Sequence, residues 1–287
     1  MAHALPTAPP AAGWHARLAL RFERRGAGTR LVSNRHHGPL RLIRALAGED
    51  GSCHAVLVHP PGGLVGGDTL DIDVELGQAA CVLCTTPGAQ KWYRSSGATS
   101  RSATRLQVGP GAMLEWLPQP AIVYDAARAE QHVSFELDES ARLIGWECLV
   151  LGRAAMGERF LRGHLRQHLS VRVGGQLVWA ERMAAAAGER LFASPLGWGG
   201  RTVAATVWAA GPAPESLLAQ WRDALAVFEA APGGLAAGAT RPAPGLLVAR
   251  VLADDAEAVM NAAQALWRLA RPALAGSAAP PPRIWAT

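Results

Sequence analysis

The chain contains 287 residues, of which 49% are hydrophobic and 18% are charged. This composition excludes an intrinsically disordered chain and predicts a globular protein with a substantial core. The formal net charge is +5 and arginine carries almost all of the positive charge, but the basic residues form no run of four or more, which disfavours a nucleic-acid-binding module.

Residues 1–13 are expected to form a flexible N-terminal tail. Three prolines interrupt this segment and no basic region precedes an apolar core, so it does not resemble a secretory signal. No stretch of the sequence reaches the ~18 uninterrupted apolar residues that a membrane span needs. The four cysteines are few for this length, which is typical of proteins in a reducing compartment. We therefore expect a soluble, cytoplasmic protein without a membrane partner.

From residue 14 to residue 287 we expect a single β-rich domain. Between Leu18 and Trp208, apolar and polar residues alternate with a period of two, which is typical of half-buried strands. The clearest case is the segment of residues 70–76, where Leu, Ile, Val and Leu alternate with two Asp and one Glu. Turn residues at 109–111, 138–140 and 174–175 separate such strands, and the last pair predicts a hairpin. We predict a mainly β fold, a large layered or helical sheet structure of many antiparallel-rich strands.

Two helices are expected near the C-terminus, over about residues 214–229 and 255–271. In the first, Pro214 fits the first turn, and apolar residues recur at helical spacing. In the second, Asp254 and Glu257 form a start that resembles a capping box, and Pro272 is expected to end the helix.

A glycine-rich segment at residues 62–67 has the spacing of a phosphate-binding loop. The Lys and Ser or Thr that such a loop needs are absent, and Asp68 follows instead, so we expect a sharp turn before the strand of residues 70–76. An alternative interpretation treats Asp68, Asp71 and Asp73 as ligands of a divalent ion, in a carboxylate-dependent hydrolase or lyase.

Two other pairs of residues have spacings that deserve a test for metal binding. Cys81 and Cys84 lie in a predicted strand, where three positions separate them by ~10 Å on opposite faces, so we expect buried thiols. His164 and His168 also lie in a predicted strand, ~13 Å apart, too far for one ion. The sequence contains neither the G-x-S-x-G nor the H-E-x-x-H motif, and a catalytic role is not expected.

The stretch from Gly38 to Arg182 resembles the UreD family of urease accessory proteins through a series of short motifs in the same order. These motifs are Gly38-Pro39-Leu40, Cys53-His54, the segment of residues 60–68 that ends in GGLVGGD, Thr85-Thr86-Pro87-Gly88-Ala89 with Lys91, Leu114-Glu115-Trp116-Leu117-Pro118-Gln119, Gly145-Trp146-Glu147, Leu151-Gly152-Arg153 and Gly157-Glu158-Arg159-Phe160. The terminal Pro282-Arg283-Ile284-Trp285 also fits the family. One departure is at Pro120 and Ala121, where the family often has an acidic residue.

The resemblance implies a β-rich fold with two helices near the C-terminus and a non-catalytic role as a scaffold. Such proteins assemble with a helical UreF-type protein and a UreG-type GTPase on apo-urease. GTP hydrolysis by the partner accompanies delivery of nickel to the urease active site, and a separate metallochaperone supplies the metal. The resemblance therefore implies no tightly bound cofactor but a transient encounter with Ni²⁺.

A route for nickel through the chain would use scattered single ligands, because a closed site of four ligands would not release the ion. Asp68 and Glu147 are the first candidates. The alternatives are that Asp68 caps a turn and that Glu147 pairs with a buried arginine. The further candidates for nickel transit are Lys91, Glu115, His37 and His54, and ion pairs at strand ends would equally explain Lys91 and Glu115.

Aromatic and large apolar residues near the C-terminus are candidates for contact with the UreF-type partner, since exposed aromatic residues mark binding hot spots. The segment of residues 280–287 is rich in proline but keeps two large apolar side chains, which predicts that it docks on another surface. The candidate partner-binding residues are Trp221, Phe228, Trp267, Ile284 and Trp285.

Overall fold

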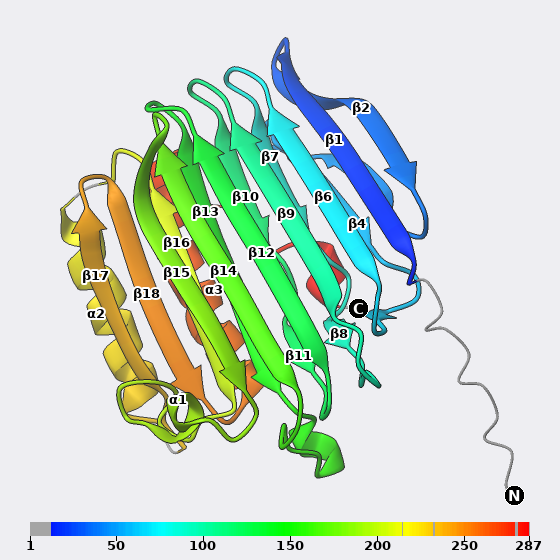
Figure 1. Cartoon of the computed structure of the whole chain (residues 1–287). Helices are drawn as coiled ribbons and strands as arrows, with labels where there is room; N and C mark the ends of the chain where they lie inside the picture. The colour runs from blue at the N-terminus through cyan, green and yellow to red at the C-terminus, as the bar shows by residue number, and fades with distance from the viewer. Residues whose placement is uncertain (1–12, 214, 232, 279–280, 287) are drawn as a thin grey trace, which may run out of the picture.

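A computed structural model describes residues 13–213, 215–231, 233–278 and 281–286. Two β-sheets lie face to face, and the two long helices lie behind them in the view of Figure 1. The N-terminal segment for which a flexible tail was predicted lies outside the described residues, apart from Gly13.

The first sheet, sheet A, has seven strands. In spatial order they are β15 (Gln176–Ala186), β14 (His164–Val173), β12 (Arg128–Leu137), β9 (Ser100–Val108), β6 (Thr69–Leu76), β1 (His15–Arg25) and β2 (Gly28–His37). The predicted alternation of residues 70–76 is confirmed, because Leu70, Val74 and Leu76 are buried while the acidic residues between them face away from the core. The hairpin predicted at residues 174–175 is also confirmed, since β14 and β15 pair as antiparallel neighbours there.

The second sheet, sheet B, has eleven strands. Its main path runs through β17 (Ala236–Ala243), β18 (Leu246–Ala253), β16 (Val203–Ala210), β13 (Arg142–Leu151), β10 (Met113–Leu117), β7 (Cys81–Thr85), β4 (Cys53–Val58) and β3 (Arg41–Ala47). Three short strands extend it, in which β11 (Ala121–Val123) pairs with β13 and β8 (Gln90–Trp92), and β8 pairs with β5 (Gly63–Leu64).

The prediction of mostly antiparallel strands is wrong for the middle of both sheets. β1, β6, β9, β12 and β14 pair in parallel in sheet A, and so do β4, β7, β10 and β13 in sheet B. In this middle part the chain passes repeatedly from one sheet to the other. The turns at residues 109–111 and 138–140 therefore connect strands of facing sheets and not neighbouring strands. Period-two alternation reveals a strand but not the direction of its partner, and antiparallel pairs are confined to the ends of the sheets.

The predicted helices are present with different boundaries. α2 spans Ser216–Glu229, and Pro214, which was expected in its first turn, lies outside the described residues. α3 spans Ala256–Ala275 and continues through Pro272, so the expectation that this proline ends the helix is wrong. The helix ends at Gly276, whose φ of 77° is the left-handed conformation that glycine adopts readily.

The residue that caps α3 also differs from the prediction. The carboxylate of Asp255 accepts hydrogen bonds from the backbone N–H groups of Glu257 and Ala258, which makes it the N-cap. Asp254 instead accepts the N–H of Thr202 and pairs with Arg201. The prediction that Asp254 caps the helix is therefore wrong by one residue. Sequence spacing alone leaves an uncertainty of about one residue at a helix start.

Two layers of apolar side chains make up the core. One layer lies between sheets A and B, and the other lies between sheet B and the helices α2 and α3. Short helical turns complete the described chain, namely η1 (Ala154–Met156), α1 (Arg190–Ala193) and η2 (Arg283–Ala286). None of the helices in the described part of the chain is long and apolar enough to span a membrane.

Candidate functional site

Glu147 is a buried carboxylate on β13 that points between the two sheets. Trp116 on β10 donates its indole N–H to Oε1 at 2.8 Å, and Gln131 on β12 of sheet A donates its Nε2 to Oε2 at 2.9 Å. Gln167 on β14 in turn donates its Nε2 to the Oε1 of Gln131 at 2.8 Å. A chain of neutral polar groups therefore holds the carboxylate of Glu147, and the alternative that it pairs with a buried arginine is wrong.

This environment gives Glu147 a strongly shifted acidity. Burial favours the neutral acid and raises its pKa to about 7, although the hydrogen bonds from Trp116 and Gln131 oppose the rise. The group is therefore close to half protonated near neutral pH. A carboxyl with this pKa can hold a proton or release it to bind a cation at little cost.

Glu147 also lines a pocket of about 580 Å³ between the sheets. Polar side chains from four further strands share its wall, namely Gln167 on β14, Glu181 on β15, Thr206 on β16 and Arg250 on β18. Glu181 forms an ion pair with Arg250 at 2.6 Å and accepts a hydrogen bond from the hydroxyl of Thr206 at 3.2 Å. The segment around α1 closes another side with Leu191, Leu196 and Trp198, of which Leu196 is almost fully exposed.

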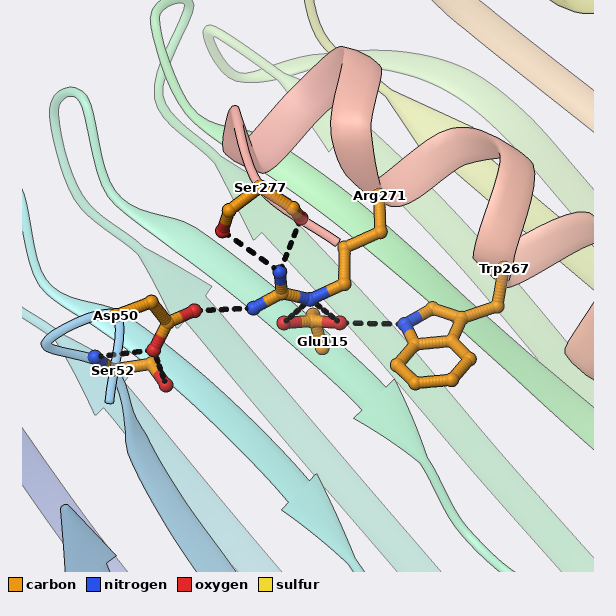
Figure 2. A network of polar contacts seen from close by, with 6 residues as sticks. All are labelled: Asp50, Ser52, Glu115, Trp267, Arg271 and Ser277. Carbon is orange, nitrogen blue, oxygen red and sulfur yellow. Dashed lines mark hydrogen bonds and ion pairs between the residues drawn. The ribbon is translucent and has the colours of Figure 1, made fainter. Parts of the chain in front are cut away.

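Glu115 lies on the opposite side of sheet B, under α3. Its carboxylate accepts the indole N–H of Trp267 at 2.6 Å and the Nε of Arg271 at 3.2 Å from each oxygen. Figure 2 shows the Arg271 guanidinium between Glu115 and Asp50, with Asp50 Oδ2 at 2.5 Å from Nη2. The third nitrogen, Nη1, donates to the backbone oxygen and the hydroxyl of Ser277. Glu115, and not Glu147, is thus the carboxylate that pairs with a buried arginine.

The two acids that share Arg271 differ in acidity. Burial raises the pKa of Asp50, but the hydrogen bonds from Ser52 and Arg271 outweigh this effect and lower it to about 2. Burial raises the pKa of Glu115, and Arg271 and the indole of Trp267 oppose the rise. The side chains of Arg271 and Glu115 are only 2% and 3% exposed, whereas that of Asp50 is 30% exposed. The network therefore joins buried groups of strand β10 and helix α3 to the loop between β3 and β4 at the surface.

Asp68 has the role of a turn cap. Its two carboxylate oxygens accept the backbone N–H groups of Trp14 at 2.8 Å and Val65 at 2.9 Å. The adjacent Gly67 has a φ of 96°, a conformation that strongly favours glycine. The sharp turn predicted from the glycine-rich segment is confirmed, and Asp68 ties that turn to the start of β1.

The remaining nickel-transit candidates are dispersed. Lys91 is half-buried on β8, and its side chain forms no hydrogen bond or ion pair with any residue that the structure describes. His37 is exposed at the end of β2, where its ring lies 6.4 Å from that of His15. His54 lies on β4, and burial lowers its pKa. Within the described ranges, no three His, Cys, Asp or Glu side chains are arranged to hold a metal ion.

The acids of the hydrolase alternative do not converge on one point. Asp71 pairs with His15 at 2.8 Å, and Asp73 pairs with Arg17 and Arg105 on the outer face of sheet A. Each carboxylate is therefore engaged by a different partner, while that of Asp68 is occupied by the turn. This geometry does not support a shared carboxylate centre.

The expected exposed aromatic surface is not present on the helices. Trp221 and Trp267 are completely buried, and Phe228 is half-buried. Trp285 donates its indole N–H to the hydroxyl of Thr85 at 2.8 Å, and its ring contacts those of Trp146 and Trp267. Trp221 and Trp267 lie on the buried faces of the amphipathic helices α2 and α3, where apolar periodicity places core residues. Trp285 packs beside Trp267. Ile284 is half-buried next to Trp285.

Sequence reasoning missed several members of both networks. Gln131 and Gln167 occupy inward-facing positions of strands in which apolar and polar residues alternate. The available signal was a polar residue at a position where the alternation predicts an apolar one. Arg271 likewise falls among the buried positions of α3. Asp50 had no comparable signal, because it lies in a loop whose approach to α3 depends on the fold.

Comparison with known proteins gives a consistent result across almost the whole chain. A family model described as "UreD urease accessory protein" matches residues 15–286. A protein of Alkalilimnicola ehrlichii named urease accessory protein UreD is 45% identical, covering 98% of this chain and 94% of its own length. Proteins of the same name from Azoarcus sp. and Pseudomonas aeruginosa strain UCBPP-PA14 are also 45% identical, and cover 99% and 100% of this chain.

Proposed function

The chain belongs to the UreD family of urease accessory proteins, and on this basis we propose that it is a non-catalytic scaffold for nickel insertion into urease. In this role it binds apo-urease together with a UreF-type protein and a UreG-type GTPase. GTP hydrolysis by the latter accompanies transfer of nickel, which a separate metallochaperone supplies. Nickel is the cargo of this process, and the chain needs no tightly bound cofactor.

The observation that carries a nickel-handling role for this chain is the carboxyl of Glu147 at the wall of the pocket between the sheets. A pKa of about 7 lets this group exchange a proton for a divalent cation near neutral pH. A single carboxylate with neutral neighbours holds such a cation weakly, which transit requires. Glu181 in the same pocket offers a second oxygen ligand if it exchanges Arg250 for the ion.

The other candidate acids fit structural roles better. Glu115 faces the guanidinium of Arg271, whose positive charge opposes the approach of a cation. Both oxygens of Asp68 already accept backbone N–H groups. We therefore infer that Glu147 carries nickel transit, while Glu115 and Asp68 hold the fold.

The test is urease maturation in cells that express the urease subunits and the other accessory proteins, with variants of this chain. Glu147→Gln keeps the size of the side chain but removes its charge, and it should leave urease poor in nickel although the accessory complex still forms. Glu136→Gln is the matched control, because Glu136 lies on the exposed face of sheet A and pairs with Arg172 at 3.7 Å.

Two results would contradict the proposal in different ways. Full urease activity without this chain would reject the maturation role. Normal nickel content with Glu147→Gln, in cells where omission of the chain abolishes activity, would reject the route through Glu147 and leave the scaffold role intact.

A further inference from the structure

Cationic side chains gather in a second pocket, of about 220 Å³, on the outer face of sheet A. It lies where β9, β12 and β14 begin, on the face of sheet A that is opposite to Glu147. Its lining consists of Thr99, Arg101, Arg128, Ala129, Glu130, His164 and Arg166. Parallel register aligns these residues in rows, with Arg128 beside His164, and with Glu130 between Arg101 and Arg166.

The cations of this pocket outnumber its anions. Glu130 is the carboxylate in the lining, and Arg101 at 3.4 Å and His132 at 3.0 Å already engage it. The side chains of Arg128 and Arg166 form no hydrogen bond or ion pair with any residue in the described ranges. On the same face, by contrast, Arg17, Arg105 and Arg172 each pair with an acid.

Arg128 also carries a buried donor without an acceptor. Its Nε is shielded from solvent and has no hydrogen-bond partner in the described structure. A buried N–H of a charged group that lacks an acceptor is costly, and native proteins rarely leave one unpaired. The donor and the excess of positive charge together indicate that an anion is missing from the pocket.

We propose that this pocket binds a phosphate-class oxoanion, held by the guanidinium groups of Arg128 and Arg166 with support from Arg101 and His164. The planar fork of arginine matches the oxygens of a phosphate, and two such forks on neighbouring rigid strands form a preorganised site. The volume is below the ~300–1,000 Å³ typical of pockets for larger ligands, so the site fits one free oxoanion or one phosphoryl group of a nucleotide.

The next row of the same face supports this assignment. His132 and His168 are paired in register, with ring centroids 5.6 Å apart, and the Nε of Arg182 lies 3.4 Å from His168. Burial lowers the pKa of His168, and the charges of Arg182 and His132 lower it further. This part of the sheet therefore disfavours added positive charge, which argues against a metal site and for an anion. The inference is independent of the nickel route.

The first experiment titrates the full chain with inorganic phosphate at constant ionic strength and measures binding by calorimetry or by NMR. We expect saturable binding that Arg128→Gln and Arg166→Gln each weaken about tenfold or more, since a hydrogen bond to a charged group contributes roughly a factor of ten to a hundred. Arg172→Gln is the matched control and should change affinity less than about twofold. Glu130→Gln removes the competing carboxylate and should strengthen binding.

Further titrations distinguish a free phosphate ion from a nucleotide as the ligand. Nucleotide triphosphate that binds no tighter than inorganic phosphate identifies a free ion as the ligand, and markedly tighter binding identifies a nucleotide. Arg128→Lys retains the charge without the fork, so it should fold normally and still bind more weakly. Absence of saturable phosphate binding, or binding that the Arg128 and Arg166 variants do not weaken, would overturn the proposal. Binding only to long polyanions, regardless of these variants, would also overturn it.

Discussion

Glu115 and Glu147 lie on neighbouring parallel strands of sheet B but project to opposite faces. Glu115 pairs in register with Ile144, so Glu147 is three positions further along β13 and faces the other way. Glu115 meets Arg271 and Trp267 beneath α3, whereas Glu147 meets Gln131 of sheet A. The two acids therefore do not form one continuous row, and substitution of each should have a different effect.

Stability should depend on pH through Glu147. Its pKa rises from 4.5 in the unfolded chain to about 7 in the folded protein, so the folded state binds more protons between these values. Stability from this group is fully present below the unfolded pKa and is lost as pH rises towards 7. Comparison of the native chain with Glu147→Gln should show the variant gaining about 2–3 kcal/mol relative to the native chain between about pH 5 and about pH 8.

The measurement is urea-induced unfolding of both proteins across this pH range. Glutamine at position 147 can keep the local hydrogen bonds. The side-chain amides of Gln131 and Gln167 can each flip, so that the direction of donation along the chain is reversed. A stability difference that does not vary with pH would show that Glu147 is ionised in the folded protein at all of these pH values.

Loss of Arg271 should destabilise the fold strongly. Arg271→Ala leaves Glu115 buried without a counter-ion, and removal of one partner of a buried pair costs about 3–5 kcal/mol. The control Arg268→Ala on the same helix, where the native side chain is exposed and contacts Gln264, should stay within about 0.5 kcal/mol. Replacement of both Glu115 and Arg271 by Leu should recover much of the loss. Chemical denaturation of the native chain and these three variants measures the free energies of unfolding. Equal losses for Arg271→Ala and Arg268→Ala would refute the prediction.

Trp285 should contribute to stability by packing on its own chain. Trp285→Ala removes the contacts with Trp146 and Trp267, and should cost roughly 2 kcal/mol, less than the ~3–5 kcal/mol for a fully buried aromatic. Trp285→Phe keeps a ring but loses the hydrogen bond to Thr85, and should cost about 1 kcal/mol. Trp14→Ala, at a side chain that is 63% exposed, is the control. Thermal unfolding measures these effects, and capture of the UreF-type protein by the Phe variant tests whether Trp285 also serves that contact.

Asp68→Asn should destabilise the glycine turn by about 1–2 kcal/mol, because an amide offers one acceptor where two backbone N–H groups need one each. Asp71→Asn, which weakens a solvent-exposed pair with His15, should cost less than about 1 kcal/mol. Equilibrium unfolding compares the two variants at the same pH. Similar costs for both would argue against the turn-capping role.

Local structure could be predicted well from the sequence, but the way in which strands pair within the sheets could not. The alternation in residues 70–76 and the glycines at 174–175 were sufficient to predict a strand and a hairpin, because both depend on neighbouring residues. Strand direction depends on which sheet the chain enters after a turn, and the turn at residues 109–111 contains no residue that distinguishes these outcomes. A layered sheet structure was predicted, but the parallel pairing of neighbouring strands within each sheet was therefore not predictable.

The candidate site was predictable in part. Glu147 stood out as an acid in an otherwise apolar strand, and the structure places it in the pocket between the sheets. Its partner Gln131 and the pairing of Glu115 with Arg271 across 156 positions depend on the folded arrangement. Trp221 and Trp267 were expected at the surface, yet the same helical periodicity that located the helices also places both residues in the core.

The contact between Arg271 and Glu115 bears on how the chain is made. A ribosome completes sheet B up to β13 long before it releases α3, so the nascent protein holds an acid that must wait for its counter-ion. A chain that stops before α3 would leave part of one face of sheet B open to proteases and chaperones. Synthesis of α3 is therefore coupled to closure of the core, and copies that lack this helix are exposed to quality control before they can join an assembly.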